Sequence, residues 1–172
     1  IWAVQEPGVG PFHRLVPLEL DAPAGGVAFL AVASGEDIDL SWRASDGSEV
    51  AAARIDNLSL AGIAEGPGGW LVLGTGVSQE IVYTALVEVT AGGEVSRTVL
   101  DGDSNRVGVG LEPRPGGGWW VIQTRDVGLD LGHYDIEVLA FDQELALVSS
   151  RTIGSGEGAH GLGAIGRPDG GL

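Results

Sequence analysis

The sequence predicts an all-β domain, and three observations support this prediction. Glycine supplies 30 of the 172 residues, shows no collagen period and is interleaved with apolar runs, which is typical of many short strands joined by tight turns. No stretch combines a helical period with capping residues. The runs at 81–89 and 134–142 instead alternate apolar with polar residues, as half-buried strands do.

Composition excludes several classes of function. The chain is 44% hydrophobic, so it can form a core despite a formal net charge of -15. Its 9 basic residues are all arginines scattered among 24 acidic residues, whereas nucleic-acid binding needs clustered basic side chains. We therefore expect no nucleic-acid partner. No apolar run is long enough to predict a membrane span, and the lack of cysteine excludes a disulfide scaffold.

A repeat organises the chain. Glycine pairs, each preceded by proline, end at Gly26, Gly69, Gly118 and Gly171, at intervals of 43, 49 and 53 residues. Each interval begins with an apolar run directly after the glycine pair. A second, a third and a fourth run follow, separated by turn residues such as Asp-Gly and Gly-Gly. The repeating unit is therefore expected to hold four short strands.

The expected strands follow in order along the units. The unit 25–67 is expected to have strands at 27–34, 38–44, 51–55 and 60–65. The unit 68–115 is expected to have strands at 70–76, 81–89, 95–99 and 107–113. The unit 116–172 is expected to have strands at 119–124, 134–142, 149–153 and 161–168. Residues 1–24 form a partial unit.

Four strands per unit, repeated along the chain, predict a β-propeller-like fold of about four units in a single domain, 1–172. A lone unit has two apolar faces and can bury them only against its neighbours. The adjacent Trp119 and Trp120 point to opposite faces of their strand, so each is expected to pack against one neighbouring unit. Since the chain opens on Ile1, we expect a piece of a longer protein; closure into a small ring of four units is the alternative.

An arginine recurs in successive units, and these residues are predicted to be equivalent. They are Arg14, Arg54, Arg97 and Arg151. An arginine at a repeated position is expected to brace its unit by pairing with a carboxylate or a carbonyl group.

Two segments, 97–118 (RTVLDGDSNRVGVGLEPRPGGG) and 151–171 (RTIGSGEGAHGLGAIGRPDGG), resemble the glycine-rich β-propeller repeats of bacterial secreted and surface proteins. The shared features are a Pro/Ser-Asp-Gly-Gly turn, an aromatic-apolar strand and a glycine-rich segment that carries an acidic residue. The resemblance covers about 25–172. It implies a propeller fold and an extracellular or cell-envelope location.

A calcium site is the one cofactor site that the sequence suggests. The segment 101–105 (DGDSN) has oxygen-bearing side chains at its first, third and fifth positions, as a calcium-binding loop does. The candidate ligands are Asp101, Asp103, Asn105 and Glu112. Arg106 occupies the place where such a loop needs glycine, so the alternative is an ordinary polar turn without metal.

Acidic residues gather in the two longest predicted loops, 33–39 and 124–135. We predict that these loops form a ligand-binding surface, because the loops of a propeller gather on one face of a rigid scaffold. The candidate ligand-binding residues are Glu36, Asp37, Asp39, Asp126, Asp130 and Asp135. The expected ligand is a protein, with polysaccharide as the alternative.

The predicted function is that of a non-catalytic protein-interaction module outside the cell or in its envelope. One alternative is a carbohydrate-active hydrolase or lyase that uses two loop carboxylates. Another is a structural subunit of an oligomer or fibre whose end strands pair between chains. No catalytic residue is assigned: His13, His133 and His160 are interpreted as solvated loop residues, and the GxGxxG match at 156–161 does not open a helix.

Overall fold

The computed structural model describes residues 14–21, 26–33, 37–44, 46–101, 105–126 and 134–153. These residues form strands and turns and contain no helix, which confirms the all-β prediction for this part of the chain. It follows that the described residues include no helix able to cross a lipid bilayer.

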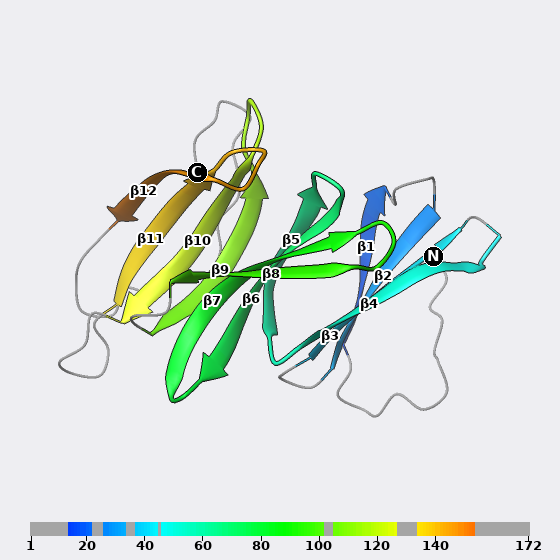
Figure 1. Cartoon of the computed structure of the whole chain (residues 1–172), viewed down its shortest axis with the longest axis horizontal. Helices are drawn as coiled ribbons and strands as arrows, with labels where there is room; N and C mark the ends of the chain where they lie inside the picture. The colour runs from blue at the N-terminus through cyan, green and yellow to red at the C-terminus, as the bar shows by residue number, and fades with distance from the viewer. Residues whose placement is uncertain are drawn as a thin grey trace.

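The strands form three sheets of four strands each, which Figure 1 shows side by side. Sheet A contains β1 (Arg14–Asp21), β2 (Gly26–Ala33), β3 (Asp37–Ala44) and β4 (Glu49–Asp56). Sheet B contains β5 (Ser59–Gly66), β6 (Gly69–Ser78), β7 (Ile81–Thr90) and β8 (Val95–Asp101). Sheet C contains β9 (Arg106–Pro113), β10 (Trp119–Asp126), β11 (Tyr134–Phe141) and β12 (Leu147–Ile153). Within each sheet the strands follow chain order and neighbouring strands run antiparallel.

The glycine pairs that end at Gly26, Gly69 and Gly118 lie between the first and second strands of sheets A, B and C, so the sheets begin one strand earlier than the repeat of the sequence. The expected strand 60–65, placed last in the unit 25–67, lies in β5 and is the first strand of sheet B. In sheet C, the turn 114–118 joins β9 to β10, and the Arg114 N–H donates to the Gly118 carbonyl at 2.9 Å. Gly118 has a φ of +86°, and a Cβ there would lie 2.0 Å from a backbone oxygen of β11. Glycine is therefore required at this joint.

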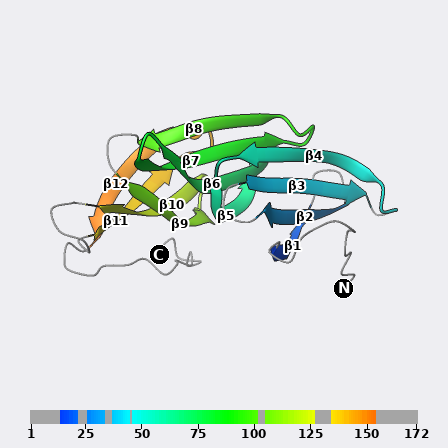
Figure 2. The ribbon, with the colours of Figure 1, turned by 90° about the horizontal axis from the view of Figure 1, so that it is seen from below.

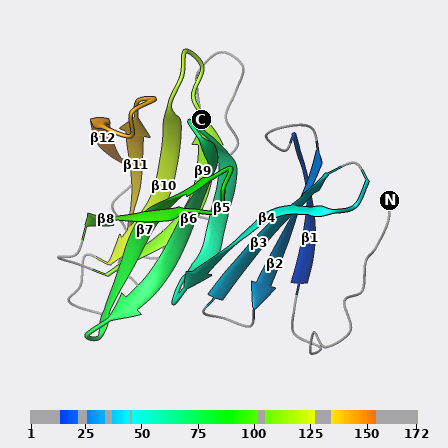
Figure 3. The same ribbon diagram turned by 45° about the vertical axis from the view of Figure 1, so that its right-hand side comes forward.

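Sheet B lies between sheets A and C, as Figures 1, 2 and 3 all show. Neighbouring residues of β6 point to opposite faces of the sheet, and both faces are apolar. Trp70 and Val72 join a core cluster with sheet A, whereas Leu71 and Leu73 join a second cluster with sheet C. A sheet that is apolar on both faces can bury them only between two other layers.

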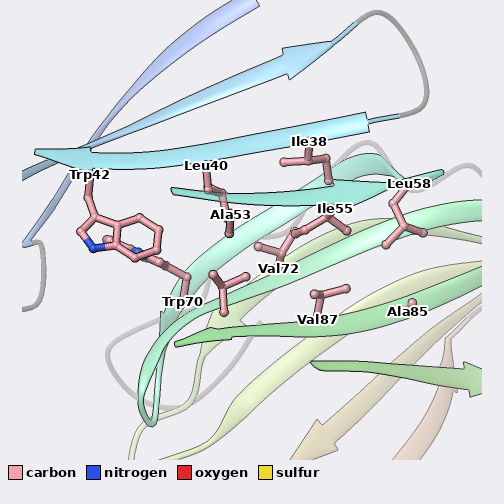
Figure 4. Close-up of a cluster of buried hydrophobic side chains, with 11 residues drawn as sticks. Ile38, Leu40, Trp42, Ala53, Ile55, Leu58, Trp70, Val72, Ala85 and Val87 are labelled. Carbon is pink, nitrogen blue, oxygen red and sulfur yellow. The ribbon is translucent and has the colours of Figure 1, made fainter. Parts of the chain in front are cut away.

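The core between sheets A and B is built from alternate residues of facing strands (Figure 4). Sheet A contributes Ile38, Leu40, Trp42, Ala53 and Ile55, and sheet B contributes Trp70, Val72, Ala85, Val87 and Val89, with Leu58 between the sheets. The buried indoles of Trp42 in sheet A and Trp70 in sheet B lie close together in this core, near the glycine turn between β5 and β6. Burial of side chains this large supplies most of the energy that holds the two sheets together.

The tryptophans of β10 behave differently from each other. Trp119 is buried against sheet B, and its indole N–H donates to the Glu65 carbonyl at 3.0 Å, which confirms the predicted packing. Trp120 points to the other face of sheet C and is half-buried. The Arg114 guanidinium lies 4.7 Å from the centre of the Trp120 ring, a cation–π contact.

Candidate functional site

In sheets B and C, we call the face that packs on the preceding sheet the leading face; in sheet A, the leading face is the equivalent one, which is directed away from sheet B. The leading face of sheet B packs on sheet A, and that of sheet C packs on sheet B. In β3, Ile38 and Leu40 point into the core with sheet B, so Asp37 and Asp39 point to the leading face of sheet A. This face is the candidate functional site.

Arg54 organises the leading face of sheet A. It lies on β4 directly opposite Asp39 in the strand register. Its Nη2 lies 2.5 Å from an Asp37 oxygen, its Nη1 3.6 Å from Asp39 and its Nε 2.8 Å from Asp56. The Arg54 side chain remains 58% exposed and that of Asp39 43% exposed, so the cluster is open to solvent.

The three carboxylates act together on this arginine. They raise the pKa of Arg54, first through the hydrogen bond to Asp56 and then through the charges of Asp37 and Asp39. Asp37 also accepts the backbone N–H of Asn57 at 3.0 Å, which fixes its carboxylate at the turn into β5. The arrangement is a charged surface of defined geometry, with more acidic than basic groups.

Arg97 of sheet B connects this cluster to the next sheet. Its Nη2 donates to the Asp56 carbonyl at 2.5 Å. Arg54 and Arg97 therefore pair with carboxylate and carbonyl groups, as predicted for the recurring arginines. The expected equivalence of Arg14 is wrong, because Arg14 begins β1, the first strand of its sheet. Arg54, Arg97 and Arg151 all lie on fourth strands.

Sheet C repeats the same acidic motif at the same place. Val27 and Trp119 directly follow the glycine pairs of sheets A and C. Each pairs with a residue of the next strand, Val27 with Arg43 and Trp119 with Phe141. Counting back along the strand from these partners, 37–39 (Asp-Ile-Asp) and 135–137 (Asp-Ile-Glu) occupy equivalent positions. Both acids of each motif point to the leading face of their sheet. In sheet C that face is covered by sheet B.

The buried copy of the motif is bound by two arginines of its own sheet. One Glu137 oxygen accepts hydrogen bonds from Arg106 Nε at 3.1 Å and from Gln123 Nε2 at 2.9 Å. The other Glu137 oxygen lies 3.3 Å from Arg125 Nη1, and Arg125 also donates to Asp135 at 3.2 Å. The side chains of Glu137 and Arg106 are only 12% and 6% exposed. This copy is a structural network, because its charges are neutralised within the sheet.

A hydrogen bond ties this network to sheet B, and one buried atom of the network has no partner among the described residues. The Thr84 hydroxyl donates to the amide oxygen of Gln123. Asp135 Oδ1 is buried and has no hydrogen-bond partner among the described residues. The network therefore fixes the end of sheet C against sheet B.

The predicted acidic surface is divided by the fold. Asp37 and Asp39 lie within β3, Asp126 ends β10 and Asp135 lies within β11. Their assignment to loops is therefore wrong, because alternation with apolar residues places them in strands. Sheets A and C lie on opposite sides of sheet B, so the two groups do not meet. Glu36 and Asp130, together with His13, His133 and His160, lie outside the described residues.

Two of the four predicted calcium ligands, Asn105 and Glu112, lie far apart. Asn105 precedes β9 and Glu112 lies near its far end, about 23 Å away at the rise of an extended strand. The Asn105 side-chain oxygen accepts the N–H of Val82 at 2.9 Å, and its carbonyl accepts that of Asp126. Glu112 as a ligand of this loop is therefore wrong. Asp103 and the Asp101 side chain lie outside the described part.

Several important residues of these clusters were missed from sequence. They are Asp56, Arg106, Gln123, Arg125 and Glu137. The signal that could have found them is the recurrence of Asp-Ile-acid at one position of the repeat.

In comparisons with known proteins, no protein-family model, no curated protein and no solved structure matches this chain.

Proposed function

We propose that this chain is a β-propeller-like domain that works as a non-catalytic protein-interaction module. The stacking of the sheets supports the propeller: the first strands β5 and β9 contact each other, and so do the fourth strands β4 and β8. Successive sheets thus follow one another in the same sense, as the blades of a propeller do. The extracellular or envelope location rests on the resemblance of the repeats to those of secreted and surface proteins.

A single observation carries the interaction function: on its leading face, β3 has the polar residues Ser41 and Arg43 where the equivalent strands of sheets B and C have buried apolar residues. The position of Ser41 corresponds to Val87 in sheet B and Leu139 in sheet C, both buried against the preceding sheet. The position of Arg43 corresponds in the same way to the buried residues Val89 in sheet B and Phe141 in sheet C. Polar groups held on a rigid sheet are suited to specific contacts with another protein.

The described acid pairs support a binding function over glycoside cleavage. A glycosidase needs one carboxylic acid that donates a proton and one free carboxylate. Here Asp37 and Asp39 share one arginine, and Asp135 and Glu137 share another. An acid whose oxygens contact a guanidinium of its own sheet is directed toward that arginine and not toward a sugar.

Affinity capture tests this function. The purified chain is immobilised and incubated with the secreted and envelope fractions of its source organism, and retained material is identified by mass spectrometry. We expect a protein retained in stoichiometric amount and released by salt, because exposed charge pairs are screened. Retention of polysaccharide alone, with cleavage of that polysaccharide by the chain, would refute the proposal in favour of the enzyme.

A further inference from the structure

The trailing face of sheet C, opposite to its leading face, has the pattern of a face that another sheet covers. In sheet B, the residues of the trailing face that are buried in the core with sheet C are Leu71, Leu73 and Leu86. The strand register places at the equivalent positions of sheet C the residues Trp120, Ile122 and Val138. Ile122 and Val138 are only 3% and 7% exposed, although neither of the two core clusters between sheets includes them. A further layer is therefore expected on this face.

Gly110 of β9 leaves room for a strand to pass over the trailing face of sheet C. It is buried and pairs with Ile122. The equivalent residue of sheet B is Gly62 of β5, which pairs with Leu73. There β9 passes so close to β5 that a Cβ on Gly62 would lie 2.8 Å from the backbone nitrogen of Leu111. A glycine at the same place in sheet C allows a backbone to approach β9 as closely as β9 approaches β5.

The segment 161–168 has the place in the chain where the next sheet should begin. The expected strands 60–65 and 107–113 lie in β5 and β9, the first strands of sheets B and C. The expected strand 161–168 follows β12 as those strands follow β4 and β8. It lies outside the described residues.

The sequence of 161–168 matches that of β5. A bulge in the pairing of β5 with β6 brings Leu60 and Ile63 to the same face, where both pack against the core with sheet A. Leu162 and Ile165 have the same spacing and the same distance to the glycine pair that follows them. The segment contains no acidic residue. It can therefore bring two apolar side chains and no carboxylate to a buried face.

We propose that 161–168 packs on the trailing face of sheet C as the first strand of a fourth sheet. Its backbone passes over Gly110, and Leu162 and Ile165 contact Ile122. The inference rests on the propeller-like stacking in the proposed function and extends that stacking by one interface. The segment follows β12 on the same chain, so its effective concentration at this face is high. A second copy of the chain carries the same net charge of -15 and is repelled, which favours the chain's own segment.

Methyl NMR on the full chain, labelled at isoleucine, leucine and valine, tests this contact. We expect nuclear Overhauser effects (NOEs) between the methyl groups of Ile165 and those of Ile122 and Val138. An isotope-filtered experiment on mixed labelled and unlabelled copies should detect no such NOE, because the contact lies within one chain. Absence of these NOEs from the labelled chain, or their presence between copies, would overturn the inference.

Gly110→Ala tests whether a backbone passes over this residue, and Gly68→Ala is the matched control. A Cβ at Gly68 meets no atom within 4 Å. We expect Gly110→Ala to abolish the NOEs of Ile165 and to keep those within the two cores between sheets, whereas Gly68→Ala keeps all of them. Wild-type NOEs of Ile165 in Gly110→Ala would contradict the proposed path of the strand. If Gly110→Ala fails to fold, the NOEs of the unaltered chain decide.

Affinity capture separates this inference from the proposed function. If capture retains a protein but Ile165 shows no NOE to sheet C, the inference fails and the proposed function stands. If the NOEs are present but capture retains no protein, the proposed function fails and the inference stands.

Discussion

The repeated acidic motif allows one substitution to be compared at two equivalent places. Glu137→Gln keeps the shape of the side chain but removes the charge that Arg106 and Arg125 contact. The Glu137 and Arg106 side chains are almost completely buried, so solvent cannot replace the lost carboxylate. Breaking a buried ion pair costs about 3–5 kcal/mol, and the retained amide oxygen places Gln at the lower end, about 3 kcal/mol. For a chain of this length that corresponds to a loss of roughly 6–12 °C in Tm.

Asp39→Asn makes the corresponding change on the exposed leading face of sheet A. The Asp39 oxygen lies 3.6 Å from Arg54, which keeps its closer contacts with Asp37 and Asp56. An exposed pair of this kind contributes little, so we expect a Tm change under roughly 1 °C. The two variants thus separate the effect of burial on stability from the effect of the motif itself.

Urea unfolding followed by tryptophan fluorescence measures both effects, because buried Trp42, Trp70 and Trp119 report loss of the stacked sheets. The midpoint should fall clearly for Glu137→Gln and stay near wild type for Asp39→Asn, with the slope unchanged in both. Equal, small effects would refute the view that the Glu137 network fastens sheet C to sheet B. Equal, large effects would show that the leading face of sheet A is already buried.

Four further predictions concern the turns and the contact between Arg114 and the Trp120 ring. Gly118→Ala should lower Tm by roughly 6–12 °C or more, a loss on the order of 3 kcal/mol or more, because a Cβ there meets a backbone oxygen. Gly116→Ala, with a similar φ of +87° but open space around it, should cost about 1–2 kcal/mol in the same thermal melt. Hydrogen bonds from the hydroxyl and the backbone N–H of the serine two residues on lower the pKa of Asp46 below 3.8. Because the folded pKa is depressed, this turn keeps its stabilisation above pH 3.8 and loses it as pH falls through the folded value; a carboxyl-carbon titration with a midpoint at or above 3.8 would contradict this. Arg114→Ala removes the guanidinium from the face of Trp120 and should lower the free energy of unfolding in urea by about 1 kcal/mol. An unchanged midpoint would show that the contact contributes nothing to stability.

Local patterns predicted the strands well, for physical reasons that act over a few residues. The expected strand 81–89 is observed as β7, and 119–124 as the start of β10. The alternation of apolar and polar residues indicates which side chains of a strand are buried, and glycine pairs indicate where the chain turns sharply. The same patterns misplaced the boundaries of the sheets. A glycine pair resembles the start of a unit, but it joins two strands that hydrogen-bond to each other.

The candidate site was less accessible to prediction from sequence. Acidic residues were assigned to loops because charge is common there, although 37–42 (Asp-Ile-Asp-Leu-Ser-Trp) alternates as a strand does. The arginine partners come from other strands of the same sheet, and only the strand register brings them into contact. Arg54 reaches Asp37 across 17 positions of sequence, and Arg106 reaches Glu137 across 31.

The sequence by itself determined that the described part of the chain is all-β and where its turns lie. These properties depend on local backbone preferences and side-chain alternation. Only the tertiary structure decided that one copy of the motif is sealed between two sheets while the other faces solvent. The two copies are nearly identical in sequence, and what distinguishes them is whether another sheet packs on that face. That packing decides whether the acids are part of the core or exposed to solvent.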